Sequence, residues 1–293
     1  MFGKDKLNKQ DRKIYTQGYH PESEQEKLLS FSVKEAYKAV RTNIVLSLIK
    51  DGCKIITFTS PIPSEGKSTT VSNIAVSLSK AFYKVLIIDC DLLKPRLHKI
   101  FKIKNTSGIS NVLSKLSTFE ESVHVLDEYS GLHVLTAGIS VPNSSEMLGS
   151  SRMKATLEEL SQKYDYILID TPPINVLSDG LSLARVSDGV VLVIRQNHST
   201  HDELKHALNS LNFISAKVLG VVYNGAYSGS GRKYYGKSSK YGKYGRYGRY
   251  GSYGRYGKYG SYGASYAATY GDEERKSNAK EFVSIDPSDD TSS

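Results

Sequence analysis

The middle of the chain alternates between short apolar runs and amphipathic stretches, whereas both ends are polar. Six runs rich in Val, Ile and Leu predict strands at Lys54–Thr59, Val85–Asp89, Leu132–Ala137, Tyr166–Asp170, Gly189–Arg195 and Val218–Asn224. Four stretches between them predict helices at Val33–Ile49, Lys67–Ala81, Arg152–Lys163 and His201–Leu211. Continuous apolar runs are typical of strands that are covered on both faces. The alternation therefore predicts an α/β fold with a mostly parallel β-sheet and helices on both faces.

The composition divides the chain into four segments. Residues 1–30 are polar and lack periodicity, which predicts a flexible arm, and residues 31–227 carry the strand–helix pattern of a folded domain. Residues 228–271 are rich in Tyr, Gly and basic residues, and between 241 and 262 a tyrosine recurs at every third position. Glycine at this density disfavours helix and strand, and the absence of proline there argues against a collagen triple helix. We therefore expect a disordered tail, followed by a disordered polar segment at residues 272–293.

The positive charge belongs to the tail and not to the folded domain. The net charge is +9, and residues 228–271 hold nine Lys and Arg and no acid, so the rest of the chain has 39 − 9 = 30 basic against 30 acidic residues. Two cysteines, Cys53 and Cys90, form no disulfide framework, which suits a reducing cytosol. We see neither a signal peptide nor an apolar run of roughly 20 residues, so membrane attachment would need a partner.

The strongest chemical signal is the loop that runs from Ser60 to Thr69, with the sequence Ser-Pro-Ile-Pro-Ser-Glu-Gly-Lys-Ser-Thr. It follows a predicted strand and opens a predicted helix, as a phosphate-binding loop must. Gly66 permits close backbone approach, Lys67 supplies charge for the phosphates and Ser68 supplies a hydroxyl for Mg²⁺. The alternative, an accidental Gly-Lys-Ser turn, does not explain the flanking elements. We predict that ATP binds to Ser64, Glu65, Gly66, Lys67, Ser68 and Thr69.

Three aspartates follow predicted strands. Asp89 and Asp91 end one apolar run and Asp170 ends another. Ligands gather at the carboxyl ends of parallel strands, so we expect these carboxylates to meet the phosphate-binding loop at one edge of the sheet. Asp170 fits a Walker B acid, and the other two could bind Mg²⁺ or accept a proton. One such aspartate is often only a turn or helix cap, but this does not readily explain all three.

Together, the phosphate-binding loop, Asp89-Cys90-Asp91 and Asp170-Thr171-Pro172 resemble the bacterial tyrosine kinases, and most closely the separate cytoplasmic kinase subunit of Gram-positive capsule and exopolysaccharide systems. The resemblance covers roughly residues 31–227. It implies a P-loop tyrosine kinase that uses ATP and Mg²⁺, with Lys67, Asp89, Asp91 and Asp170 as catalytic residues. It also implies that Ser68, Asp91 and Asp170 hold Mg²⁺, that Asp89 is the candidate base or orienter of the tyrosine hydroxyl, and that Asn224 contacts adenine.

The resemblance further implies autophosphorylation of the tail, in trans, and phosphorylation of other proteins such as sugar-nucleotide enzymes, in the control of capsular or exopolysaccharide synthesis and export. A separate membrane protein would activate the kinase through its cytoplasmic tail and recruit it from the cytoplasm to the inner face of the plasma membrane. The expected phosphoacceptors are Tyr241, Tyr244, Tyr247, Tyr250, Tyr253, Tyr256, Tyr259, Tyr262, Tyr266 and Tyr270.

Two positions depart from the family pattern. Glu35, Lys38 and Arg41 match a Glu-x-x-Arg-x-x-Arg helix that packs kinase subunits into a ring, but Lys38 replaces the first Arg and cannot form the same bidentate fork. An ordinary solvated charged face explains these residues equally well. Leu93 stands where the family usually has Arg shortly after the second Asp, and Lys94 or Arg96 are the candidate substitutes.

Three other functions remain as alternatives at this point. A Min- or Par-type ATPase shares the fold, but its signature Lys, five residues before the P-loop Lys, is Ile62 here. A single-strand nucleic-acid binder would use the Tyr, Arg and Gly residues of the tail but would leave the nucleotide site without a role. A silent scaffold would account for Leu93. We expect nucleic-acid binding not to be the main function.

Overall fold

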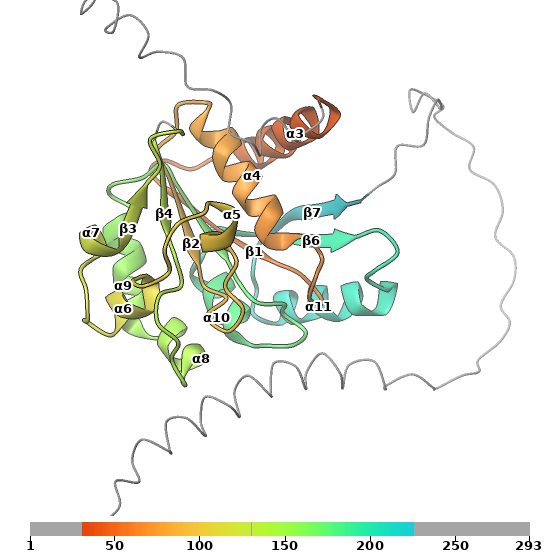
Figure 1. The fold of residues 1–293 in the computed structure, drawn as a ribbon. Coiled ribbons are helices and arrows are strands. Elements are labelled where there is room, and N and C mark those ends of the chain that lie inside the picture. The colour runs from red at the N-terminus through yellow and green to blue at the C-terminus, as the bar shows by residue number, and fades with distance from the viewer. Residues whose placement is uncertain (1–30, 130, 226–293) are drawn as a thin grey trace, which may run out of the picture.

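Seven strands form one sheet in the order β3-β4-β2-β5-β1-β6-β7 (Figure 1). The computed structural model describes residues 31–129 and 131–225, so the segments predicted at residues 1–30 and 228–293 lie outside it. The strands are β1 (Lys54–Thr59), β2 (Val85–Asp89), β3 (Val123–Val125), β4 (Leu132–Leu135), β5 (Tyr166–Asp170), β6 (Gly189–Arg195) and β7 (Val218–Asn224). All neighbours pair in parallel except β3 and β4, which are antiparallel. The predicted α/β architecture is confirmed.

Five strands have the predicted bounds, and two elements of the sheet differ. The expected strand Leu132–Ala137 ends at Leu135, because Thr136 and Ala137 offer their carbonyls to Ile109 and Ser110 instead of to a neighbouring strand. Strand β3 was not predicted, since three residues are too few to show an alternating pattern.

Nine helices lie in the described ranges. They are α3 (Phe31–Ser47), α4 (Lys67–Ser79), α5 (Leu97–Ile100), α6 (Ile109–Leu113), α7 (Phe119–Ser122), α8 (Ser144–Leu148), α9 (Ser151–Leu160), α10 (Asp179–Val186) and α11 (His201–Phe213). The expected helix 33–49 begins and ends two residues earlier, and the one expected at 67–81 ends two residues earlier, before Phe82 with its positive φ of 66°. The helix expected at 152–163 spans 151–160, and the one expected at 201–211 extends to 213. Helices α5 to α8 and α10 were missed because eight or fewer residues show little helical periodicity.

The helices cover both faces of the sheet. Alternate residues of β2 point to opposite sides: Val85 and Ile87 pack in the core under α3 and α4, whereas Leu86 and Ile88 pack toward α9 and α10. A third apolar cluster joins β6 to α11. All four of these β2 side chains are buried, which explains the continuous apolar run of this strand. In Figure 1, α3 and α4 lie on one side of the sheet and α10 and α11 on the other.

The order of the central strands fixes the position of the functional residues. Strands β2, β5 and β1 are neighbours, with Asp89 opposite Asp170 and Asp170 opposite Phe58 in the parallel register. Residues 60–66 connect the end of β1 to the start of α4. The phosphate-binding loop and the three aspartates therefore share one edge of the sheet, as predicted. Within the described residues, no helix is long and apolar enough to cross a membrane.

Candidate active site

The turn from β1 into α4 has the backbone of a phosphate-binding loop. Ser64 and Gly66 adopt positive φ angles of 67° and 84°. The positive φ of Gly66 favours glycine, and a Cβ atom there would lie 2.7 Å from Nδ2 of Asn224, so a larger residue would have to displace the Asn224 side chain. Gly66 is the N-cap of α4, and among the described residues no side chain forms a capping hydrogen bond to this helix. The backbone N–H groups of the first turn can therefore bind an anion.

Contacts from two other segments hold this loop in place. The N–H of Ile174 donates to the carbonyl of Ser60 at 2.9 Å, and the ring of His198 lies 2.9 Å from the carbonyl of Pro63. The hydroxyl of Ser199 donates to the buried carboxylate of Glu65, whose pKa is raised by burial. The Glu65 side chain thus holds the loop in place. The contact between Glu65 and ATP that the sequence predicts would therefore be made by the Glu65 backbone.

Asn224, the last residue of β7, also holds the loop. Its Nδ2 donates to the carbonyl of Glu65 and to Oγ1 of Thr70, both at 2.9 Å. The carboxyl end of β7 thereby fastens the loop to the first turn of α4. The contact with adenine expected for Asn224 stays a prediction, whereas its contact with the loop could not be expected from the sequence.

Lys67 and Asp170 form an ion pair in the floor of the site. Lys67 Nζ lies 2.7 Å from Oδ1 of Asp170, and the side chains are 8% and 0% exposed. Burial opposes the lysine charge, but the carboxylates of Asp170, Asp91 and Asp89 outweigh it and raise the pKa of Lys67. The second oxygen of Asp170, Oδ2, is buried and has no hydrogen-bond partner among the described residues. This oxygen is available to a ligand such as a hydrated cation.

The two aspartates that follow β2 face different surroundings. Oδ1 of Asp89 accepts from the N–H of Asp91 at 3.2 Å, and Oδ2 accepts from the N–H groups of Arg96 and Leu97, each at 2.9 Å. Burial, and next the charge of Asp170, raise the pKa of Asp89 to about 7. Asp91 lines the cavity between the phosphate-binding loop and the turn after β2, whereas Asp89 does not line it. Asp89 therefore holds the turn over residues 91–97 in its present shape, while Asp91 faces the ligand space.

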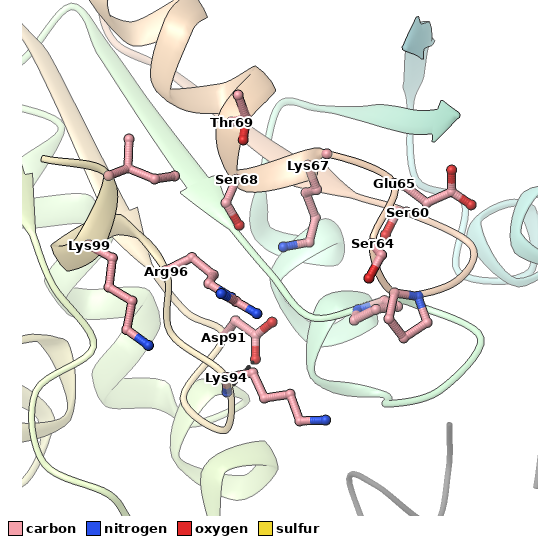
Figure 2. A pocket seen from close by; sticks show the side chains of 14 residues that line it. Ser60, Ser64, Glu65, Lys67, Ser68, Thr69, Asp91, Lys94, Arg96 and Lys99 are labelled. Carbon is pink, nitrogen blue, oxygen red and sulfur yellow. Dashed lines mark hydrogen bonds between the residues drawn. The ribbon is translucent and has the colours of Figure 1, made fainter. Parts of the chain in front are cut away.

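A cavity of about 560 Å³ lies between the phosphate-binding loop and the turn after β2 (Figure 2). This volume suits a nucleotide-sized ligand. Figure 2 shows Lys67 and Ser68 on one side and Asp91, Lys94 and Arg96 opposite them. The lining residues are Ser60, Pro63, Ser64, Glu65, Gly66, Lys67, Ser68, Thr69, Asp91, Lys94, Arg96, Lys99, Ile100 and Pro173. Four of these are cationic and two are acidic, which favours a polyphosphate.

The residues that line the cavity show which cations lie near Leu93, where the family usually has Arg. Lys94 and Arg96 both line the cavity, whereas Leu93 does not; the substitution of either for the family's Arg stays a prediction. Lys99 also lines it, and the sequence analysis missed this residue. The signal that could have revealed Lys99 is its position three residues after Arg96, on the one-turn helix α5, where both can reach the same side.

The expected assembly residues lie on α3. Lys38 Nζ pairs with Oε1 of Glu35 at 2.7 Å, and Nη1 of Arg41 donates to the carbonyl of Ser77 in α4 at 2.8 Å. Arg41 thus contributes to packing within the subunit, and the role of this face in a ring stays a prediction.

Known proteins resemble this chain in both sequence and fold. Residues 53–220 match the model of a family described as AAA domain. The chain is 38% identical over 204 residues to the putative tyrosine-protein kinase CapB of Staphylococcus aureus, covering 70% of this chain and 89% of that protein. It is 39% identical over 208 residues to the tyrosine-protein kinase YwqD of Bacillus subtilis, covering 71% and 84%. The kinase domain of the Escherichia coli tyrosine kinase ETK superposes with a TM-score of 0.66 at 26% identity, over 80% of this chain and 90% of that one.

Proposed function

We propose how the residues of this chain, which belongs to the bacterial tyrosine-protein kinases, divide the work of phosphoryl transfer. The chain is a tyrosine-protein kinase with an ATP-binding P-loop domain. One observation carries the proposal: a cavity bounded by a phosphate-binding loop, a buried Lys67–Asp170 pair and the carboxylate of Asp91. Phosphoryl transfer needs mainly positioning and neutralisation of charge, and this cavity offers both.

Phosphate binding would rest on the first turn of α4 and on Lys67. The backbone N–H groups of this turn point toward the position of an anion, and the helix dipole favours negative charge there. Lys67 is held 2.7 Å from Asp170 and would exchange this partner for phosphate oxygens. Arg96 lies across the cavity, so its guanidinium could add a second positive charge, with the forked geometry that suits phosphate.

The residues present fit Mg²⁺. No group of three or more His, Cys, Asp and Glu residues forms a metal cluster within the described ranges. Mg²⁺, however, usually takes only one or two carboxylates and completes its shell with waters and substrate phosphates. Ser68 and Asp91 line the cavity, and Oδ2 of Asp170 is buried without a hydrogen-bond partner among the described residues. We assign these three residues to the cation, which would neutralise charge on the phosphates.

Asp91 is better placed than Asp89 to meet the acceptor tyrosine. Both oxygens of Asp89 already accept backbone N–H groups, whereas Asp91 faces the cavity and accepts one such group, from Lys94 at 3.0 Å, at Oδ1. In the transfer, a bond forms between the tyrosine oxygen and the γ-phosphorus as the bond from that phosphorus to the β-phosphate oxygen breaks. The hydroxyl proton passes to a carboxylate, for which we assign Asp91; its part in holding the cation would then be through water, so that a carboxylate oxygen remains to take the proton. Asp89 acts as a positioning residue, because it holds the N–H of Arg96.

The acceptors would be the tail tyrosines between Tyr241 and Tyr270, reached in trans. A glycine-rich tail of 44 residues (228 to 271) spans roughly 35–40 Å as a random coil, and tethering gives a local concentration on the order of mM. Each phosphate adds about −1.5 to −2 charges. About five or six phosphates would therefore neutralise the +9 of the tail and convert it from a binder of acidic surfaces to a neutral or acidic segment. If changing every tail tyrosine to Phe left assembly unaltered, this charge switch would be excluded.

We further propose a role in capsule or exopolysaccharide synthesis and export, supported by the names of relatives such as CapB of S. aureus and a kinase "in cps region" of Klebsiella pneumoniae. A ring of subunits, a membrane activator that recruits the kinase to the inner face of the plasma membrane, and further substrates such as sugar-nucleotide enzymes belong to the same proposal.

The test is a phosphotyrosine assay on the full chain with Mg-ATP, with and without the cytoplasmic tail of a candidate activator. We expect phosphate on Tyr241 to Tyr270, and its loss in Lys67→Met. Glu120→Gln, a charge removal at an exposed ion pair, is the matched control that should retain activity. ATP hydrolysis without phosphotyrosine, even with the activator, would instead indicate a switch ATPase. Salt-sensitive RNA binding without phosphotyrosine would indicate the nucleic-acid alternative.

A further inference from the structure

Lys99 lines the nucleotide cavity but has no part in the mechanism proposed above. The residue is exposed, and within the described residues no hydrogen bond or ion pair holds its ammonium group. In Figure 2, Arg96 lies between Lys99 and the phosphate-binding loop, which places Lys99 at the outer end of the cavity. This cation is therefore available to an anionic group at that end.

The acceptor tail, in its unmodified form, brings positive charge toward Lys99. Residues 228–271 hold nine Lys and Arg and no Asp or Glu, and six of the eight tyrosines between 241 and 262 directly follow a Lys or Arg. Like charges repel, so Lys99 disfavours these unmodified repeats. A phosphate on tyrosine adds about −1.5 to −2 charges. With no acid in this segment, phosphotyrosine is the negative side chain that the proposed activity would place in it.

The spacing of the tail tyrosines matches the size of the cavity. A sphere of about 560 Å³ is about 10 Å across, and three residues of extended chain span about 10 Å. A tyrosine recurs at every third position between 241 and 262. When one tyrosine hydroxyl lies beside Asp91, the next tyrosine along an extended segment can therefore reach the end of the cavity where Lys99 lies.

We propose that Lys99 binds the phosphate of a phosphotyrosine already present in the tail and thereby selects the neighbouring tyrosine as the next acceptor. The inference rests on the proposed function, because it concerns the acceptor of that reaction. Lysine binds phosphate as a point charge, and the neighbouring Ile100, which also lines the cavity, offers an apolar surface to the tyrosine ring. Each phosphate thus favours the next transfer, and phosphorylation spreads along the tail from the first modified repeat.

Two peptides with the sequence of residues 248–258 test the proposal, with the full chain as the kinase. Both contain the acceptors Tyr250 and Tyr256; at the position of Tyr253 one carries Phe and the other carries phosphotyrosine. Initial rates at low peptide concentration, with Mg-ATP and under the conditions of the assay above, give kcat/KM for each peptide by mass spectrometry. The tail of the chain competes equally with both peptides, so the ratio of the two values is unaffected.

We expect the phosphotyrosine peptide to react about tenfold faster at Tyr250 and Tyr256, which is the effect of one charge-assisted hydrogen bond. Lys99→Gln should bring the ratio close to one, and Lys99→Arg should restore it because the charge remains. Lys205→Gln, the same change at an exposed position of α11, is the matched control and should keep the tenfold ratio.

Equal rates for the two peptides with the unmodified chain, or a tenfold ratio that persists in Lys99→Gln, would overturn the proposal and leave the proposed function intact. If Lys99→Gln raised the KM for ATP equally with both peptides and kept the ratio, Lys99 would belong to the nucleotide site instead. Phosphotyrosine in the tail of the chain but in neither peptide would also exclude the proposal. Its absence from tail and peptides alike would reject the proposed function and this inference with it.

Discussion

Lys67 and Asp170, which stand 103 residues apart in the sequence, form a buried ion pair with Nζ 2.7 Å from Oδ1. The pair holds the lysine beside the cavity. It also leaves Oδ2 of Asp170 without a hydrogen-bond partner among the described residues. A phosphate at Lys67 and a cation at Oδ2 of Asp170 would each contact a group of this pair.

Asp170→Asn should destabilise the ligand-free protein. The change leaves the Lys67 charge buried without its nearest partner, and breaking a buried pair in this way costs about 3–5 kcal/mol. Urea unfolding at pH 7 measures the loss. Glu120→Gln is the matched acid-to-amide control, because its pair with Lys163 is exposed and contributes at most about 1 kcal/mol. Equal losses in the two variants would show that the Lys67–Asp170 pair is not structurally important.

Asn224→Ala should weaken nucleotide binding more than it weakens folding. It removes two hydrogen bonds that hold the loop, from Nδ2 to Glu65 and to Thr70. At about 0.5–1.5 kcal/mol each, their loss corresponds to roughly 5–150-fold in affinity. Titration with a fluorescent ATP analogue measures the effect. Asn212→Ala, on the exposed side of α11, should bind as the unmodified chain does. Unchanged affinity in Asn224→Ala would mean that the loop keeps its shape without this contact.

Arg96→Gln should reduce tyrosine phosphorylation about 10–100-fold, since it removes a positive charge from the cavity across from Lys67. Arg96→Lys should retain part of the activity because the charge remains while the fork is lost. Leu93→Gln is the control, because Leu93 does not line the cavity. Initial rates of phosphotyrosine formation over a range of ATP concentrations give the comparison. A large loss in Leu93→Gln with none in Arg96→Gln would reject Arg96 as the substitute.

Protonation of His133 should lower the free energy of unfolding in mild acid. Burial lowers the pKa of His133 below its usual 6.5, and its Nδ1 lies 2.6 Å from the hydroxyl of Tyr164. The unfolded chain therefore takes up a proton at a higher pH than the folded chain does. Stability is present above about pH 6.5 and is lost as the pH falls through the lower, folded-state value.

The urea midpoint, measured at pH 7.5 and pH 5.0, gives the size of this loss. His133→Asn should show a smaller fall between the two pH values than the unmodified chain. His201→Asn, at the exposed start of α11, should show the same fall as the unmodified chain. A fall in His133→Asn as large as that of the unmodified chain would assign the acid sensitivity to other groups.

The sequence by itself determined the fold class and the main parts of the candidate site. Continuous apolar runs gave the parallel strands, because residues buried on both faces leave no polar alternation. The loop that ends in Gly66-Lys67-Ser68 was readable because its chemistry is local: a strand, a turn that needs glycine, and a helix N-terminus lie within a few residues. Asp91 and Asp170 were readable because parallel strands bring their carboxyl ends to one edge.

Only the tertiary structure decided how these residues share their contacts. The backbone donors of the turn over residues 91–97 occupy both oxygens of Asp89 and one oxygen of Asp91, Oδ1, which accepts the N–H of Lys94 at 3.0 Å, while Asp91 alone of the two lines the cavity. Asn224 meets Glu65 across 159 positions of sequence, and Lys99 reaches the cavity through the packing of a one-turn helix. The sequence pattern specifies which face of an element is buried, but partners brought together by packing depend on register and on turn geometry, which no local pattern contains.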